Sequence, residues 1–404
     1  MIKDLVEQYE VSQTKNINLV ASENVCSPDV LKILNSDLNH RYCIPPEEMR
    51  PAGLWDYPNQ EIPRKIFNTT AKLACNLFKG SVADIRPLSG NQVASIILTK
   101  LANKGDNVWS VPSNCGGHFA TKAIAKSHGI KLHDIPFDFK TGEIDIDRVS
   151  QLYQQVKPKL IFLDSSMIIK PYLLQELRKI VGEETIISYD ASHVLGLIAG
   201  GTFQSPLEEG ADLVHGSTHK SLWGPQKAII VFKEQGETAD KVLDTVLPEF
   251  VSSVHMHHVA ALGAALEEHA EFGYDYSCAV KRNVDALTNS LVKFGLPPLF
   301  SDQFSSFSHQ VIVPVGSKDK ALQAMARLES IGVNLNVINI PFKEGYGFRI
   351  GLTEITRRGY TPDDVDFIGE ILVKVTHGNV DLDEVQKEVI SLALSKTEIY
   401  FTFK

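Results

Sequence analysis

The sequence predicts an α/β protein with a mainly parallel sheet and a smaller α+β domain at the C-terminal end. Short apolar runs alternate with segments of helical periodicity, and these runs are residues 107–111, 160–164, 185–190 and 213–217. This alternation is typical of βαβ units, whose strands lie parallel in one sheet. Towards the C-terminal end, strands are predicted at residues 310–314 and 348–352, each with helical segments beside it.

We expect three parts in the 404 residues. The N-terminal arm covers residues 1–35, the large α/β domain covers residues 36–275, and a connector helix with the small C-terminal domain covers residues 276–404. The long helical pattern that begins near Val251 predicts the connector.

The composition excludes several classes of protein. Hydrophobic residues make up 43% and charged residues 22% of the chain, as in ordinary globular proteins. The net charge of −9 argues against nucleic-acid binding, because no basic surface is left to neutralise phosphates. No targeting segment or membrane-spanning run is visible, and the five cysteines are scattered, so we expect a cytoplasmic protein without disulfides.

One stretch, residues 213–225, ends an apolar strand in small hydroxyl residues and then carries His219 and Lys220. Taken alone, Lys220 reads as an ordinary loop lysine after a buried strand. A desolvated lysine can instead act as an amine nucleophile that forms a Schiff base with a carbonyl.

Further polar residues follow other predicted strands. His118 comes after two glycines, and Asp190 and His193 follow the strand at 185–190. Parallel sheets bind ligands at the carboxyl ends of their strands, so these side chains are expected to converge with Lys220. The turn Ser89-Gly90-Asn91 (the 89–91 turn) opens a helix, which either provides an anion site or is simply capped by Ser89.

Together these groups meet the requirements of pyridoxal phosphate. Lys220 would form the Schiff base, and the Asp190 carboxylate would keep the pyridine nitrogen protonated. The His118 ring would stack on the cofactor, while the 89–91 turn and Ser217 would hold its phosphate. In the C-terminal domain, the guanidinium of an arginine could bind the substrate carboxylate as a bidentate fork, and Arg349 is the candidate.

Nearly the whole chain resembles the serine hydroxymethyltransferases, which are fold-type I pyridoxal-phosphate enzymes. The motifs that carry the resemblance are residues 19–24 (LVASEN), 89–92 (SGNQ), 116–118 (GGH), 190–197 (DASHVLGL), 217–225 (STHKSLWGP) and 348–359 (FRIGLTEITRRG). Their order and spacing are also similar to the family's. The resemblance implies a seven-stranded type of large-domain sheet and pyridoxal 5'-phosphate as the cofactor.

The resemblance also implies roles for individual residues. Lys220 matches the Schiff-base lysine, Asp190 the pyridinium partner and His193 a neighbour of the phenolic oxygen. The remaining cofactor contacts implied or expected are His118, Ser165, Ser217, His219, Ser253 and the 89–91 turn. The substrate contacts are Ser22, Tyr42, Tyr57 and Arg349. In the family the two tyrosines come from the partner subunit, so a homodimer with shared active sites is expected.

The sequence departs from the family where folate would bind. Ile44 stands in place of the folate-assisting glutamate, with Glu47 or Glu48 as the alternative carboxylate. The segment 334–346 is shorter than the folate-contacting loop, and Gln226 replaces an arginine near the cofactor. The two glycines that contact the phosphate across the dimer correspond to residues 252–253, both serine.

We therefore expect an enzyme that forms a Cα carbanion on a small amino acid without folate. The expected reaction is aldol-type Cα–Cβ cleavage or formation with an aldehyde as the co-substrate, in which His193 or Tyr42 moves the hydroxyl proton. The alternatives are a tetrahydrofolate-dependent hydroxymethyltransferase, a racemase, decarboxylase, aminotransferase or β/γ-replacement enzyme, and a non-catalytic dimer. His255 and His258 lack an evident third ligand, so no metal site is expected.

Overall fold

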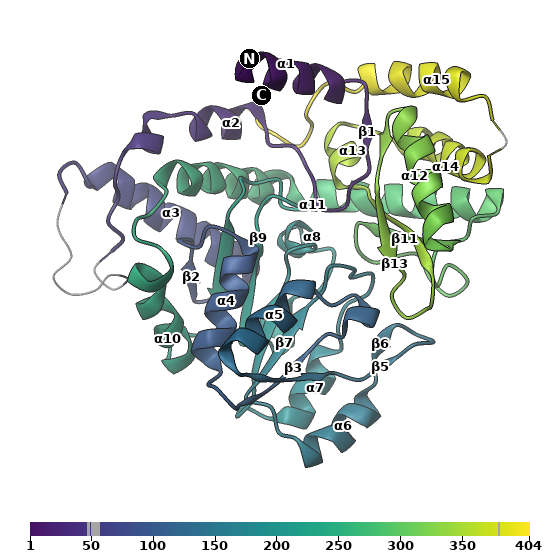
Figure 1. Cartoon of the computed structure of the whole chain (residues 1–404). Helices are drawn as coiled ribbons and strands as arrows, with labels where there is room; N and C mark the ends of the chain where they lie inside the picture. Colours follow the sequence, from purple (N-terminus) through teal and green to yellow (C-terminus); the bar gives the residue numbers. More distant parts are fainter. Residues whose placement is uncertain (47–48, 50–56, 379) are drawn as a thin grey trace. The chain divides into compact units, whose positions relative to one another are not determined.

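The computed structural model describes residues 1–46, 49, 57–378 and 380–404. The chain divides into two compact units (Figure 1). The large unit contains residues 26–274, and the small unit contains residues 1–25 together with 275–404. The long helix α11 (Met256–Phe294) passes from the first into the second. The domain boundaries predicted from sequence stay predictions.

A seven-stranded sheet forms the centre of the large unit, and it confirms the predicted mainly parallel sheet. Its strands, in spatial order, are β2 (Val82–Asp84), β10 (Ala228–Phe232), β9 (Leu213–Ser217), β8 (Ile186–Asp190), β7 (Leu160–Asp164), β3 (Asn107–Ser110) and β4 (Lys131–Asp134). The strands from β9 to β4 are parallel, whereas β10 runs antiparallel to both of its neighbours.

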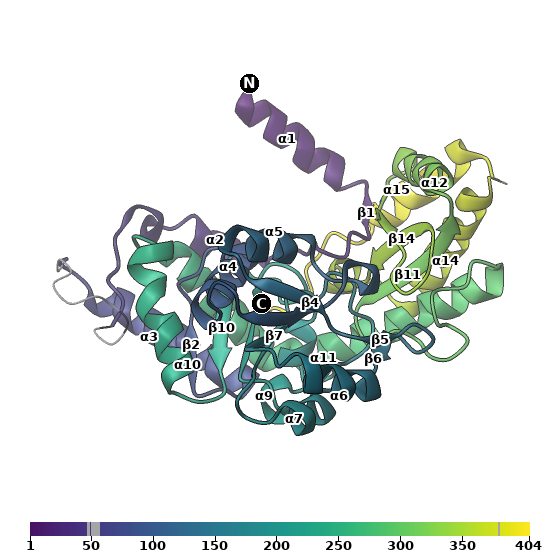
Figure 2. The ribbon, with the colours of Figure 1, turned by 60° about the horizontal axis from the view of Figure 1, so that its bottom comes forward.

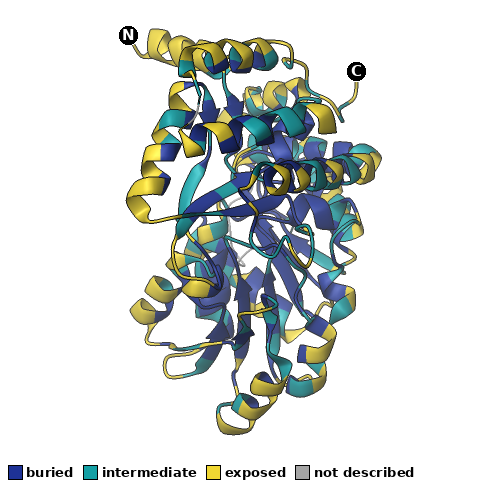
Figure 3. Ribbon diagram, turned by 90° about the vertical axis from the view of Figure 1, so that its right-hand side faces the viewer, coloured by how far each residue is buried: buried dark blue, intermediate teal, exposed yellow. Residues whose placement is uncertain are grey.

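Helices cover both faces of this sheet (Figure 2). Those of the large unit, besides the first part of α11, are α2 (Pro28–Leu34), α3 (Glu61–Phe78), α4 (Gly90–Leu101), α5 (Phe119–His128), α6 (Ile146–Gln155), α7 (Leu174–Val181), α8 (Leu195–Ala199), α9 (Pro206–Glu209) and α10 (Glu237–Thr245). Every residue of β7, β9 and β10 is buried, and Figure 3 shows the exposed residues on the outer helix surfaces. Burial on both faces explains why these strands are continuous apolar runs.

The small unit is built on an antiparallel sheet of β11 (Gln310–Gly316), β14 (Tyr346–Gly351) and β13 (Asn336–Asn339). Its helices are α1 (Ile2–Gln13), α12 (Lys318–Ser330), α13 (Thr353–Arg357), α14 (Pro362–His377) and α15 (Leu382–Leu394), besides the end of α11. The N-terminal arm joins this unit through β1 (Ile17–Asn18), which pairs with β12 (Val333–Asn334). None of the described helices is long and apolar enough to cross a membrane.

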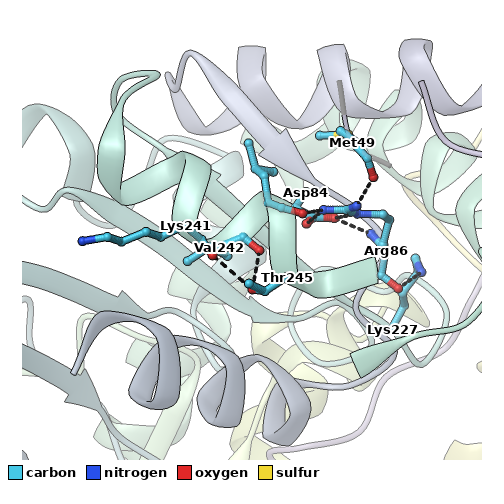
Figure 4. Close-up of polar contacts among 8 residues, drawn as sticks. Met49, Asp84, Arg86, Lys227, Lys241, Val242 and Thr245 are labelled. Atoms are coloured by element: carbon cyan, nitrogen blue, oxygen red, sulfur yellow. Dashed lines mark hydrogen bonds and ion pairs between the residues drawn. The ribbon is translucent and has the colours of Figure 1, made fainter. Parts of the chain in front are cut away.

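A buried ion pair at the edge of the large sheet anchors three segments of the chain (Figure 4). The Arg86 guanidinium donates to both carboxylate oxygens of Asp84, at 2.9 and 2.6 Å. It also donates to the carbonyls of Met49 and Leu243, at 2.5 and 2.7 Å. Both charged side chains are completely buried, so each depends on the other for charge compensation.

We predict that Asp84→Asn lowers the free energy of unfolding by about 3–5 kcal/mol, because Arg86 would be left buried without its counter-charge. The matched control is Glu208→Gln, since Glu208 and Lys79 form an equally short but exposed pair, 2.5 Å apart. Chemical denaturation should show no measurable change for the control, because exposed pairs contribute little. Equal effects of the two substitutions would contradict the prediction.

Candidate active site

A cavity of about 240 Å³ lies in the large unit at the carboxyl ends of the parallel strands. The candidate residues that line it are Ser89, Gly90, Asn91, His118, Ser165, Asp190, His193, Ser217, His219 and Lys220. The structure therefore brings together the residues that the sequence predicts at separate strand ends, as expected for a parallel sheet.

Lys220 is held by a tight turn that follows β9. The Gly224 amide donates to the Thr218 carbonyl at 2.8 Å, and the Thr218 hydroxyl donates to the Pro225 carbonyl at 2.6 Å. The Lys220 amine lies 3.3 Å from the imidazole Nε2 of His193, which places a proton acceptor or donor next to it.

Asp190 ends β8 and is oriented by the chain that follows it. One of its carboxylate oxygens accepts a hydrogen bond from the Ser192 amide at 2.8 Å. The Ser192 hydroxyl in turn accepts the Ser217 amide of β9, at 3.0 Å. A Cβ on Gly216 would lie 2.7 Å from the Ser192 nitrogen, so only glycine allows the two strand ends to approach this closely.

The 89–91 turn opens the 12-residue helix α4. Ser89 caps the helix by accepting the Gln92 amide at 3.2 Å, so the simple capping role is present. The turn also faces β9: a Cβ on Gly90 would lie 3.3 Å from the Ser217 Cβ. The Ser217 hydroxyl is buried and has no hydrogen-bond partner among the described residues. A hydroxyl donor beside a helix N-terminus fits the oxygens of a phosphate.

His118 is the N-cap of α5. Its Nδ1 accepts the Ala120 amide at 3.3 Å, which requires that nitrogen to be unprotonated. A Cβ on Gly117 would lie 2.0 Å from the Val111 carbonyl oxygen, so the approach to His118 requires this glycine. Ser165 lies nearby and donates to the Gly116 carbonyl at 3.1 Å. His118 and Ser165 thus have fixed positions on the cavity wall.

Burial sets the charges around the cavity. Desolvation, together with the neighbouring Lys220 cation, lowers the pKa of His219 to about 4, so this imidazole is neutral at pH 7. Burial raises the pKa of Asp164 well above its usual value, and the Asp190 charge adds to this effect. The Asp164 carboxyl accepts a hydrogen bond from the Thr121 hydroxyl, and it is paired with Asp190 in the β7–β8 register.

The sequence does not single out Ser192 and Thr121, which line the cavity, or Asp164, which accepts a hydrogen bond from Thr121. Ser192 lies inside a recognised motif, so its position between Asp190 and His193 was an available signal. Thr121 shows no comparable signal, because its role depends on a contact across 43 residues. For Asp164 the sequence shows only that this residue ends a predicted strand.

Three candidate residues of the large unit lie outside the described lining of the Lys220 cavity. Tyr42 stacks on Tyr57, with ring centroids 5.2 Å apart and planes 4° from parallel. Tyr42 and Ser253 line a second hollow of about 350 Å³. The structure thus does not bring these residues to the Lys220 cavity within one large unit.

Arg349 and Ser22 belong to the small unit. The Arg349 guanidinium donates to the side-chain oxygen of Asn336 at 3.1 Å, and burial lowers its pKa. The arm carrying Ser22 lies against β14, because the Gly351 amide donates to the Leu19 carbonyl at 2.8 Å. The two predicted substrate contacts therefore come from neighbouring segments of the same unit.

The positions that depart from the family pattern have defined environments. Ile44 is buried, and its amide donates to the Gln60 side chain at 2.9 Å. Gln60 also donates to the carbonyls of Tyr42 and Pro58, so its side chain connects residues 42–44 with Pro58. Gln226 is exposed. Glu47 and Glu48, the alternative carboxylates, lie outside the described residues.

Sequence comparisons with known proteins match one family. The sequence pattern of the family described as serine hydroxymethyltransferase matches residues 1–372. The serine hydroxymethyltransferase of Methanothermobacter marburgensis is 34% identical, over 100% of this chain and 95% of that protein. The enzyme of that name from Pyrococcus furiosus is 33% identical, over 100% and 96%.

A solved structure resembles the whole chain. It is the L-threonine transaldolase from Pseudomonas fluorescens in its internal aldimine state, with a TM-score of 0.94 and 27% identity over 100% of this chain and 93% of that one. The convergence of the Lys220 amine, the Asp190 carboxylate and a helix N-terminus in one cavity agrees with these matches. The chain therefore belongs to the serine hydroxymethyltransferase family and is a pyridoxal-phosphate-dependent enzyme of fold type I.

Proposed function

We propose that this enzyme makes or breaks the Cα–Cβ bond of a small amino acid with an aldehyde, and without folate. The observation that carries the proposal is the environment of Ile44. An apolar side chain occupies the position at which the family resemblance places the folate-assisting glutamate. Ile44 is buried, and its amide donates to the Gln60 side chain at 2.9 Å. An isoleucine can neither move a proton nor bind the nitrogens of folate.

Pyridoxal phosphate, when bound, supplies a pyridine ring that accepts electrons from the α-carbon of the amino acid. Lys220 provides the amine that anchors the cofactor, and His193 exchanges a proton with the Lys220 nitrogen across 3.3 Å. The Asp190 carboxylate, which the Ser192 amide orients, would stabilise the proton on the ring nitrogen. The His118 imidazole would contact the ring.

The phosphate is assigned to the 89–91 turn. The helix N-terminus favours an anion, and the buried Ser217 hydroxyl provides a further donor. Arg349 is assigned to the substrate carboxylate, and its guanidinium is kept in position by Asn336. Either His193 or Tyr42 moves the proton of the substrate hydroxyl.

A second feature supports the loss of folate binding. The segment between β13 and β14 is a short turn, closed by a hydrogen bond of 3.0 Å from the Ile340 amide to the Gly345 carbonyl. The Phe342 ring packs on Phe300, with centroids 5.9 Å apart. A closed turn of this length leaves little chain to contact a large second substrate. The name of the threonine transaldolase neighbour fits an amino acid and aldehyde reaction.

The second candidate is a tetrahydrofolate-dependent hydroxymethyltransferase, which the names of the curated relatives favour. Decarboxylation, transamination and β/γ-replacement on the same scaffold are separated by the masses of their products, and racemisation is recognised by chiral chromatography, because enantiomers have the same mass. Family membership stands against the non-catalytic alternative.

A homodimer with shared active sites is part of the proposal. Tyr42 and Ser253 line a hollow of their own, as expected if they serve a site on the partner subunit. Helix α1 has no buried residue and exposes Leu5, Val6 and Tyr9, which suits a segment covered by a second copy.

Replacing Lys220 with alanine should abolish the visible band of the lysine–cofactor Schiff base in the purified holoprotein, since no amine would remain at this position to bind the cofactor covalently. The control is Lys233→Ala, because the Lys233 side chain is exposed. Absorption spectra of the two variants provide the measurement. If Lys220→Ala keeps the visible band, the Schiff-base assignment is wrong.

Threonine cleavage and aldehyde exchange should proceed at the same rate with and without tetrahydrofolate. Serine, glycine, threonine and alanine are tested with an aldehyde acceptor, and products are identified by mass. Exchange of the glycine α-proton with deuterated water, followed by NMR, reports Cα chemistry separately. A requirement for tetrahydrofolate in this exchange would favour the second candidate.

Mixing two inactive variants tests the shared sites. A heterodimer of Lys220→Ala and Tyr42→Ala carries one complete site, so random reassociation should restore roughly a quarter of the wild-type activity. The same variants unmixed serve as controls, and their sizes are checked by light scattering. No recovery after confirmed subunit exchange would show that Tyr42 acts in its own subunit or not at all.

A further inference from the structure

The large unit contains a second buried amine, Lys227, whose side chain is completely buried. Its ammonium donates to the carbonyl of Arg86 at 3.3 Å (Figure 4). It also donates to the carbonyl of Pro87, at 3.3 Å. The Pro87 carbonyl also accepts the Ala228 amide, at 3.3 Å. Lys227 therefore binds the backbone immediately before the 89–91 turn.

The backbone of Lys227 also contacts the end of β9, which lies opposite the 89–91 turn at the proposed phosphate site. Its carbonyl accepts the Thr218 amide at 2.9 Å, and the next residue, Ala228, is paired with Ser217 in the β9–β10 ladder. Ser217 in turn faces Gly90. Lys227 thus joins the two segments that would surround the cofactor phosphate.

The charges of this cluster do not balance. Asp84 and Arg86 neutralise each other as a buried pair. When protonated, Lys227 adds one positive charge. Among the described residues, the carboxylate that interacts electrostatically with Lys227 is that of Asp84, which already forms the ion pair with Arg86. Burial, the largest effect, lowers the pKa of Lys227 to about 7, while Asp84 raises it and Arg86 lowers it.

The surroundings of Lys227 provide no compensating charge in the described chain. The charged or titratable groups that interact electrostatically with it are Asp84, Arg86, His255, His257 and His258. The pKa values of these three histidines are lowered, first by burial and in part by Lys227 itself. They are therefore neutral near pH 7, and the region remains favourable for an anion.

We propose that Lys227 is a positioning residue whose buried positive charge attracts the cofactor phosphate to the 89–91 turn. A buried charge acts over longer distances than a charge in water, because the effective dielectric constant of the protein interior is far below that of water. The inference rests on the placement of the phosphate in the proposed function. It does not depend on which Cα bond reacts or on the use of folate.

The proposal implies a pH dependence of cofactor binding. A bound phosphate dianion raises the pKa of Lys227 above its value of about 7 in the chain alone. At pH values above about 7, cofactor binding is then accompanied by protonation of the Lys227 amine. The contribution of Lys227 to affinity is fully present below about pH 7, and it is lost as the pH rises through the raised value.

The test compares wild type with Lys227→Met, a neutral side chain of similar length. Equilibrium dialysis of the full-length proteins, after removal of the bound cofactor, gives the Kd for pyridoxal phosphate, and pyridoxal, which lacks the phosphate, serves as the matched ligand. At about pH 7 the variant should bind pyridoxal phosphate about tenfold more weakly, and the difference should shrink towards pH 9. Binding of pyridoxal should be unchanged, as should both ligands in a Lys233→Met control.

Equal affinities of the variant and wild type at pH 7 would overturn the proposal. A loss that is independent of pH, or that extends equally to pyridoxal, would also overturn it, because it would indicate a structural role only. If the variant does not fold, wild type is measured alone. Its affinity for pyridoxal phosphate relative to pyridoxal should fall as the pH rises from 7 to 9, and a constant ratio would overturn the proposal. Failure of the Schiff-base assignment is recognised separately, from the spectrum of Lys220→Ala.

Discussion

The hydrogen bond between the Ser217 amide and the Ser192 hydroxyl is the contact on which the active site depends. It joins the ends of β8 and β9, and the bare Cα of Gly216 allows the two backbones to meet. Asp190 comes just before one end of this contact and Lys220 just after the other. Without this close approach, the carboxylate and the amine would not share one cavity.

Burial then decides which of the clustered groups carry charge. His219 lies beside a cation and becomes neutral, and desolvation favours a protonated Asp164. Asp190 accepts a backbone hydrogen bond, which suits a carboxylate. The site therefore presents one oriented acid to the cofactor ring instead of two competing charges. Burial acts in the same direction on Lys227, because desolvation lowers the pKa of its ammonium to about 7.

The two halves of the reaction have different structural support. The residues that would hold the cofactor converge in the large unit and agree with the family membership. The features assigned to the second substrate differ from the family pattern, at Ile44 and in the closed turn that contains Phe342. A change of second substrate needs no change in the cofactor site, because the electron-accepting chemistry is common to these reactions.

Much of the fold could be predicted from the sequence. Apolar runs buried on both faces revealed the parallel strands, and the polar residues that end them predicted the position of Lys220 and Asp190, since periodicity and strand ends are local properties. Motif order identified the family. The link through Ser192, the neutral His219 and the separation of Tyr42 from the Lys220 cavity required the tertiary structure.

The sequence by itself thus determined the fold class and the cofactor, and it predicted the residues of the reactive centre. Tertiary structure decided their charges and supporting contacts. Lys227 illustrates the reason: nothing local distinguishes it from a surface lysine, and its role arises only when distant segments bury it beside Asp84 and Arg86. Desolvation and long-range contacts depend on the packed chain, so a local pattern does not reveal them.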